Sequence, residues 1–255
     1  MQINISTTRE EAGRRAALDA AGSIREALDR QDHVTLVLAT GVSQLDMLSH
    51  LLLVEGIDWS RIDAFHLDEY IGIPSTHPAS FRGYLEARFV NRLPLPLRNF
   101  HPVQGDAPDP RLEVQRLNDL INGRRIDLTL AGIGENGHLA FNDPPADFST
   151  TEPYLEVELD EACRRQQFGE GWFASLDEVP THALSMSVHQ ILASEKIIIT
   201  CCDTRKAEAV KAAFQGPVTP AVPASALQGH QDVACYLDCA AASLLRESAS
   251  YAVVV

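Results

Sequence analysis

The sequence predicts an α/β fold: a single Rossmann-like domain with a mostly parallel sheet and helices on both faces. Apolar runs rich in Val, Ile and Leu recur along the chain, they alternate with helical segments, and several end in turns of Gly, Ser, Thr, Asp or His. Continuous apolar runs are typical of parallel strands buried on both faces, and strand–helix alternation favours a parallel sheet. A chain of 255 residues is long enough for one such domain, which we expect to span residues 1–255.

The composition indicates which partners the surface disfavours. The chain has 21 Lys and Arg against 35 Asp and Glu, which gives a net charge of -14 and a pI near 5.0. Nucleic acids and anionic membranes attract basic surfaces, so the sequence predicts neither as a partner. No apolar run approaches the roughly 18 residues of a membrane span. A phosphorylated ligand would therefore need a local positive pocket.

The cysteines and the first residues indicate a cytoplasmic protein. Five cysteines without a C-x-x-C pair are typical of reduced thiols, most simply small buried side chains: Cys163, Cys201, Cys202, Cys235 and Cys239. The N-terminus lacks the basic-then-apolar pattern of a secretory leader. We expect a soluble protein, and the sequence is compatible with a homo-oligomer.

The first part of the chain predicts a helix, a strand and a second helix. Residues 7–30 start with a capping-box pattern and are rich in Ala, Arg and Glu. Residues 33–39 are a continuous apolar run that ends in the turn at residues 40–44, before a helical segment at 45–53. Such a turn presents backbone N–H groups and hydroxyls at a helix N-terminus, which suits a phosphate group.

The next predicted strand, residues 61–67, runs directly into Asp68 and Glu69, which we expect in a loop. Neighbouring side chains of an extended chain point in opposite directions, so at most one of these carboxylates should face a given pocket. A helix cap or a solvated loop is the alternative role for such acids. Downstream we expect a helix at residues 78–93, a short extended segment at 99–103 and a second helix at 109–123.

Residues 126–145 contain the densest group of reactive side chains. A buried strand is followed by three closely spaced glycines, and then by His138 and Asp143. Ligands bind at the carboxyl ends of strands in an open α/β sheet, so this His and Asp are placed to move protons on a bound molecule. A purely structural glycine turn is the alternative, but it has no use for this pair.

The same loop matches the dinucleotide pattern G-x-G-x-x-G at residues 132–137. That pattern holds a pyrophosphate only where its third glycine opens a helix. Pro144 and Pro145 follow too soon for a normal helix, so we reject a nicotinamide or flavin site here.

The segment at about 147–180 is the least regular part of the chain and is a candidate lid. It contains an alternating stretch at 154–159 and a polar helical stretch at 160–167. Strands are expected at 182–188, 195–202 and 232–238, and helices at 204–214 and 239–247. The strand at 195–202 ends in the basic turn Thr204-Arg-Lys206, and residues 251–255 either pair on the sheet or lie loose.

Four of these strand-end segments together resemble the glucosamine-6-phosphate deaminase family, the glucosamine/galactosamine-6-phosphate isomerases. They are Thr40-Gly-Val-Ser43, Leu67-Asp-Glu-Tyr70, the glycine loop at 132–143 and Thr204-Arg-Lys206. The glycine loop, with its H-x-A-F-N-[DE]-P pattern, is the specific part, since in the related 6-phosphogluconolactonases the loop continues differently after its histidine. The similarity runs through most of the chain and includes residues 179–185.

The resemblance implies conversion of glucosamine 6-phosphate into fructose 6-phosphate and ammonia by general acid/base catalysis, with no metal and no organic cofactor. Asp68 looks like the base that removes the C2 proton. His138 looks like the proton carrier in ring opening, oriented by Asp143. Some members have Asp where this chain has Asn136, and an amide cannot take up a proton, so Asn136 is assigned positioning only.

The resemblance also implies a set of phosphate contacts, here called the phosphate cradle: Thr40, Gly41, Ser43 and Lys206. The family tends to carry an arginine on the lid, at a point where this chain reads Glu170-Gly-Trp-Phe. Arg164 or Arg165 from the neighbouring helix is the candidate substitute.

Three other functions stay open at this level. The first is a 6-phosphogluconolactonase-like hydrolase or another phosphosugar isomerase on the same scaffold. The second is a non-catalytic phosphosugar sensor. The third is a metal hydrolase using His66, Asp68, His138 and Asp143, although no close-spaced pattern such as H-E-x-x-H supports it.

Overall fold

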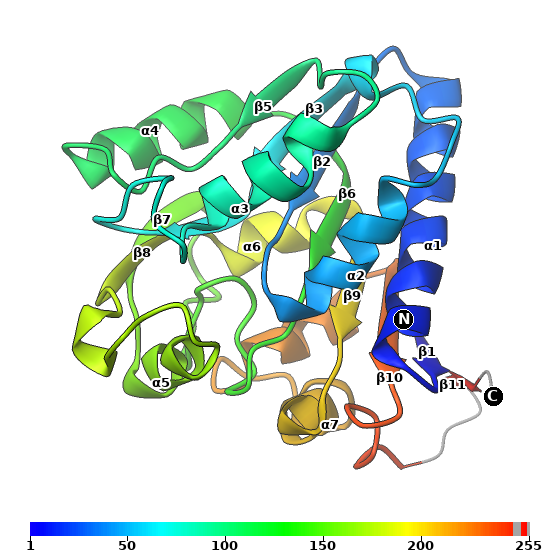
Figure 1. Ribbon diagram of the computed structural model, residues 1–255. Coiled ribbons are helices and arrows are strands. Elements are labelled where there is room, and N and C mark those ends of the chain that lie inside the picture. The colour runs from blue at the N-terminus through cyan, green and yellow to red at the C-terminus, as the bar shows by residue number, and fades with distance from the viewer. Residues whose placement is uncertain (247–250, 254–255) are drawn as a thin grey trace.

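The computed structural model describes residues 1–246 and 251–253, and a wide parallel sheet runs through them (Figure 1). Every neighbouring pair in this sheet is parallel, which confirms the predicted fold class. Within the described residues its order is β11 (Tyr251–Val253), β1 (Gln2–Ser6), β10 (Val233–Asp238), β9 (Ser194–Cys201), β6 (Ile126–Ala131), β2 (Val34–Leu38), β3 (Ile62–His66), β5 (Asn99–His101).

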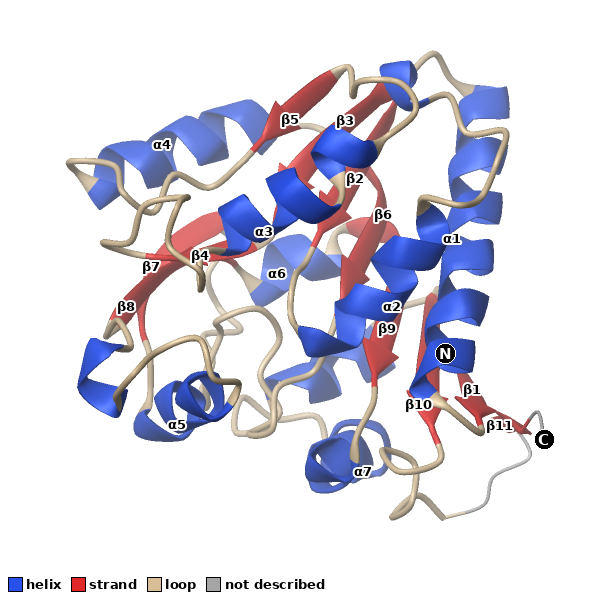
Figure 2. Cartoon of the chain, viewed as in Figure 1, coloured by secondary structure: helices blue, strands red, loops and turns tan. Residues whose placement is uncertain are grey.

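Helices cover both faces of the sheet, as Figure 2 shows. Side chains of successive strand residues alternate between the two faces, so that Leu36 and Leu38 pack in one apolar cluster and Val37 in the other. The first cluster includes residues of α1 (Arg9–Arg30), α2 (Val42–Leu51) and α3 (Phe81–Arg88). The second includes residues of α4 (Pro110–Ile121), α6 (Val188–Leu192) and α7 (Ala207–Gln215).

The order of the strands places a crevice at the centre of the sheet. From β2 the chain moves outward through β3 to β5, whereas from its neighbour β6 it moves the other way through β9 to β10. Loops that leave two such strands diverge, and ligands bind in the gap outside their carboxyl ends. In Figure 1 this end of the sheet faces α5 (Glu161–Gly169) and α7.

A second, antiparallel sheet stands beside the first and was not predicted. It has the order β4 (Asp68–Tyr70), β8 (His182–Met186), β7 (Tyr154–Glu158). The expectation of a loop at Asp68 and Glu69 was therefore wrong, because this short stretch pairs with β8. Three residues are too few to show a strand period, so the pairing comes from tertiary structure.

The two ends of the chain also differ from expectation. The strand β1 was missed, and β11 pairs with it at the edge of the sheet, so pairing is the alternative that holds for Tyr251–Val253. The expected helix at 239–247 is wrong over its described part, because residues 239–244 form successive turns closed by i to i+3 bonds such as Leu245 N–H to Ala242 O. Residue 247 lies outside the described residues. The cap of α1 is Thr8, whose hydroxyl accepts from Glu11 N–H at 3.1 Å.

Candidate active site

A cavity of about 810 Å³, including the solvent at its mouth, lies at the carboxyl ends of β2 and β6. Its wall includes the turn after β2, the start of β4, the glycine loop, the turn after β9, and the side of α5. Six of the predicted site residues line it: Thr40, Gly41, Ser43, Asp68, His138 and Lys206. The structure thus brings together residues that lie up to 166 positions apart in the sequence, between 40 and 206.

Asp68 is a buried carboxyl group at the start of β4, only 6% exposed. Burial, and next the negative charge of Glu69, raise the pKa of Asp68 to about 8. Within the described residues no group donates a hydrogen bond to it that would favour the charged form. Asp68 therefore holds its proton near neutral pH, and a nearby cation would favour its release.

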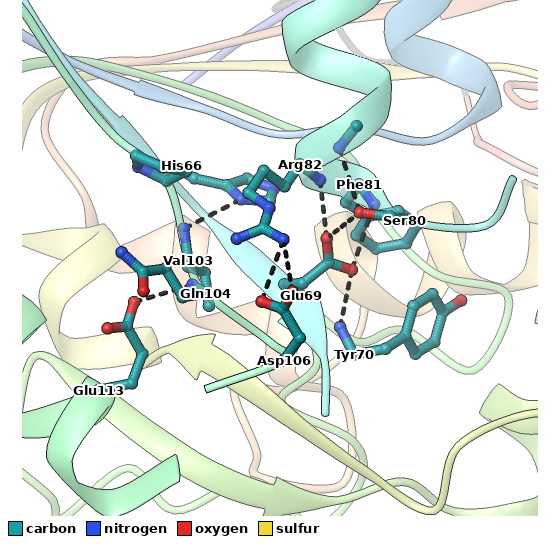
Figure 3. Close-up of polar contacts among 12 residues, drawn as sticks. His66, Glu69, Tyr70, Ser80, Phe81, Arg82, Val103, Gln104, Asp106 and Glu113 are labelled. Carbon is teal, nitrogen blue, oxygen red and sulfur yellow. Dashed lines mark hydrogen bonds and ion pairs between the residues drawn. The ribbon is translucent and has the colours of Figure 1, made fainter. Parts of the chain in front are cut away.

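Glu69 does not line the cavity but points toward the start of α3 (Figure 3). Its carboxylate accepts four hydrogen bonds there, from the Ser80 hydroxyl (2.7 Å) and the backbone N–H groups of Tyr70 (2.9 Å), Phe81 (3.2 Å) and Arg82 (2.7 Å). Burial still leaves the pKa of Glu69 raised, although these bonds act to lower it. Glu69 is a structural acid that caps α3, so only one of the two neighbouring carboxylates faces the cavity, as predicted.

His138 and Asp143 form a hydrogen-bonded pair across the glycine loop. The Nδ1 atom of His138 lies 2.9 Å from Asp143 Oδ1. A carboxylate at Nδ1 favours the tautomer with its proton there, which leaves Nε2 free to accept or deliver a proton. Gly134 is required beneath this ring, because a Cβ atom at that position would lie 2.3 Å from His138 Nε2.

Asn136 and Asp160, on the side away from the cavity, hold Asp143 in place. Asn136 Nδ2 donates to Asp143 Oδ1 (3.0 Å), and its Oδ1 accepts from the His138 backbone N–H (3.1 Å). Asp160, at the start of α5, donates its backbone N–H to Asp143 Oδ2 (3.0 Å). Burial would raise the pKa of Asp143, but the bonds from His138, Asn136 and Asp160 outweigh it and lower the pKa. Asn136 does not line the cavity, in keeping with a positioning role.

The possible metal ligands that the structure brings together differ from the set suggested by the sequence, which was His66, Asp68, His138 and Asp143. The side-chain ligand atoms of His138, Asp143 and Cys163 lie within 4.8 Å of one another. Burial, and then the charge of Asp143, raise the pKa of Cys163, so this thiol is poorly suited to become the thiolate that zinc binds. His66 is fully buried outside the cavity, where burial lowers its pKa to about 3. His138, Asp143 and Cys163 are therefore better described as a hydrogen-bonding group than as a metal centre.

The phosphate cradle lies where the turns after β2 and β9 meet. Ser43 Oγ accepts from the Cys202 backbone N–H at 3.4 Å and so joins the two turns. The Thr40 hydroxyl is buried without a hydrogen-bond partner among the described residues. Lys206 is 9% exposed, and no described carboxylate lies within ion-pair distance of it. An orphaned hydroxyl and an unpaired ammonium group on one wall suit an anionic ligand.

Two cavity-lining cations were not predicted. Arg9 pairs with Asp46 at 2.7 Å, and Arg205 pairs with Glu135 at 3.2 Å and with Asp203 at 3.4 Å. Arg205 lies within the predicted basic turn, so the prediction of Lys206 as a cavity residue could also have pointed to Arg205. Arg9 reaches the cavity only because α1 packs against α2, which no local pattern reveals.

Arg164 and Arg165 do not line the cavity. Arg164 donates to the backbone oxygens of Leu176 (2.8 Å) and Val179 (3.2 Å) and so ties the lid segment together. Arg165 is exposed and pairs with Glu161 along α5. The residues of this segment that line the cavity are instead Gln166 and Gln167 of α5 and Glu170, which follows it.

The structure also bears on the dinucleotide pattern. No helix follows the glycines, because the next element after β6 is β7.

No helix in the described part of the chain is both long and apolar enough to cross a membrane. An acid, a histidine–carboxylate pair and an anion-binding wall share one cavity, which defines an α/β enzyme that moves protons on a small anionic molecule.

The chain belongs to the family of glucosamine-6-phosphate isomerases and 6-phosphogluconolactonases, whose model matches residues 7–235. A glucosamine-6-phosphate deaminase of Exiguobacterium sp. is 37% identical over 227 residues, 88% of this chain and 86% of that protein. One from Streptococcus pneumoniae is 35% identical over 213 residues, 84% and 88% of the two chains. These relatives confirm the predicted family.

Solved structures agree with this assignment. A monomeric glucosamine-6-phosphate deaminase matches with a TM-score of 0.87 at 33% identity, over 96% of this chain and 100% of that one. A 6-phosphogluconolactonase from Trypanosoma brucei has a TM-score of 0.79 at 16% identity, over 96% and 98% of the two chains. The second match shows a common fold.

Proposed function

We propose that the protein converts glucosamine 6-phosphate and water into fructose 6-phosphate and ammonia. The observation that carries this proposal is the cavity in which Asp68 and His138, with Asp143 behind it, face the same space as the unpaired Lys206. The identity to glucosamine-6-phosphate deaminases over most of the chain supports the choice of substrate.

The phosphate end of the substrate is held by the phosphate cradle. The Lys206 ammonium supplies charge, and the Thr40 hydroxyl gains the hydrogen bond that it otherwise lacks. Backbone N–H groups of the first turn of α2, behind Gly41, add donors at the positive end of that helix. Binding at one end fixes the reacting carbons relative to the acid and the imidazole at the other.

Ring opening is assigned to His138. The ring form must lose the proton of its C1 hydroxyl and gain one on the ring oxygen, and one imidazole nitrogen can carry both protons in turn. Asp143 keeps Nδ1 protonated and stabilises the imidazolium that forms when Nε2 accepts a proton. The product of this step is the open-chain aldehyde.

Isomerisation and deamination are assigned to Asp68. Its carboxylate removes the C2 proton of the open chain while the C1 oxygen is protonated, which gives an enolamine. Return of a proton to C1 gives an imine at C2, to which water adds and from which ammonia leaves. A protonated substrate amine beside Asp68 would offset the burial that raises the pKa of this group to about 8, so binding itself favours the basic form.

The test is an ammonia-release assay over a panel of hexosamine 6-phosphates, with 6-phosphogluconolactone as a parallel substrate. We expect ammonia from glucosamine 6-phosphate, no acid release from the lactone, and turnover that survives a chelator. Acid release without ammonia would identify a lactonase, and binding without either reaction would identify a sensor. Loss of turnover with the chelator would point to a metal enzyme.

We further propose that the enzyme works in the cytoplasm as a unit that needs no second copy for its chemistry. The described cysteines are free thiols and form no disulfide, which suits a reducing compartment. The similarity to a monomeric glucosamine-6-phosphate deaminase, over 96% of this chain, supports a unit that needs no second copy. Sedimentation combined with the activity assay would test whether an assembled form differs in turnover.

A further inference from the structure

Glu170 places a carboxylate in the wall that should receive a phosphate. It follows the last residue of α5, is partly buried, and lines the cavity together with Thr40, Arg205 and Lys206. Its carboxylate accepts a long hydrogen bond from Gln166 Nε2, at 3.4 Å. Because this carboxylate accepts so little hydrogen bonding, its negative charge is stabilised mainly by the positive charges around it.

The polar and charged groups that face Glu170 come from three elements. Lys206 and Arg205 approach from the turn after β9, and Glu135 from the glycine loop, while Gln166 lies on its own helix. Burial raises the pKa of Glu170, whereas the Gln166 hydrogen bond and then the charges of Lys206 and Arg205 act to lower it. The carboxylate is therefore within electrostatic reach of both cations.

The other cations of the cavity already have carboxylate partners. Arg205 pairs with Glu135 and Asp203, and Arg9 pairs with Asp46. Among the described residues that line the cavity, this leaves Lys206 as the cation without an ion pair. A phosphate dianion and the Glu170 carboxylate would thus draw on the same positive charge.

We infer that Glu170 is a specificity-determining residue. Its carboxylate competes with the phosphate group of a ligand for the positive charge of Lys206, and so weakens the binding of phosphorylated ligands. The inference rests on the proposed function in that it takes the phosphate to bind at Lys206. Substrate and product carry the same phosphate, so the effect is uniform: it raises KM and the product dissociation constant without changing the chemical step. A carboxylate on the lid therefore keeps the product from being held too tightly.

The experiment is calorimetric titration of inorganic phosphate and of fructose 6-phosphate, without ammonia, into three proteins at pH 8. They are the wild type, Glu170→Gln, and the matched control Glu161→Gln, which removes the same charge from an exposed site on the same helix. We expect Glu170→Gln to bind both ligands at least about tenfold more tightly, which is about the effect of removing one like charge from the wall around a partly buried anion. The control should bind within about twofold of the wild type.

A second variant separates charge from new contacts. Glu170→Ala should tighten binding as Glu170→Gln does, because both remove the carboxylate, and both should lower KM while kcat changes little. Tightening by Gln alone would mean that its amide donates to the phosphate, and this would overturn the inference. Unchanged or weaker binding in both variants would also overturn it, as would failure of every variant to bind either ligand. These titrations do not depend on turnover, so an enzyme that released no ammonia would contradict the proposed function separately.

Discussion

Replacing Asp68 by Asn should make the protein more stable while removing its activity. The folded state holds the Asp68 proton with a pKa of about 8, against 3.8 for the ordinary side chain. Above pH 4 the unfolded chain releases this proton more readily than the folded one, so the wild type loses stability as pH rises toward 8. An amide of nearly the same shape does not titrate and escapes this loss.

The size of the effect follows from the two pKa values. Each pH unit between them costs about 1.36 kcal/mol, so the penalty at pH 7 is about 4 kcal/mol and at pH 5 about 1.5 kcal/mol. These are upper limits, because relaxation and water entry reduce the penalty of a buried charge. For a chain of this size about 4 kcal/mol corresponds to roughly 10 °C in Tm.

The assay is urea unfolding at pH 5, 7 and 8, with ammonia release measured on the same samples. Asp68→Asn should gain stability over the wild type progressively from pH 5 to 8 and lose about 10²–10⁴ in turnover. Asp29→Asn, an exposed acid on α1, is the matched control and should show neither change. A stability difference that is absent, or equal at pH 5 and pH 8, would refute the raised pKa and the buried-acid reasoning with it.

Three further predictions concern the rest of the cavity. His138→Gln should lower ammonia release by about 10²–10⁴ and slow ring opening more than C2 exchange; deuterium incorporation at C2 of the glucosamine 6-phosphate that forms from fructose 6-phosphate and ammonia in D₂O measures the second step, and equal losses would reassign His138. Gly134→Ala should displace the His138 ring and cost up to about 10²-fold in kcat, whereas Gly169→Ala, where an added Cβ meets nothing within 4 Å, should not; similar kcat values for the two would contradict the fit described here. Lys206→Ala should raise KM for the phosphorylated sugar and weaken inhibition by inorganic phosphate, while Arg165→Ala should leave both unchanged; the opposite result would move the phosphate to the lid.

Much of the sheet could be predicted because its strands carry their own signal. The runs that became β2, β6 and β9 are rich in Val, Ile and Leu, since both faces of the sheet are covered by helices. The acids, glycines and hydroxyls that follow them mark the strand ends, so Asp68 and His138 could be placed at one edge of the sheet before any coordinates were known.

The contacts that depend on tertiary packing could not be predicted. The pairing of β4 with β8 joins stretches over a hundred residues apart, and Arg9 enters the cavity through the packing of two helices. The orientation of α5 determines that Glu170 lines the cavity and that Arg164 and Arg165 do not. The sequence pattern of this helix is too polar to show which side faces inward. Side-chain direction on a short, mostly polar helix was the weakest part of the prediction.

The pairing of β11 with β1 has a practical consequence for attaching this protein to other objects. The amino end of β1 lies on the side of the sheet opposite the cavity, and β1, β10 and β9 separate β11 from β6. A tether, a sensor surface or a fused partner joined on the amino side of β1 therefore leaves the mouth of the cavity open to solution. Removal of β11 would instead uncover the hydrogen-bonding groups of β1, and an uncovered strand edge recruits other chains. Immobilisation through the N-terminus is thus the arrangement that suits surface-based binding measurements on this enzyme.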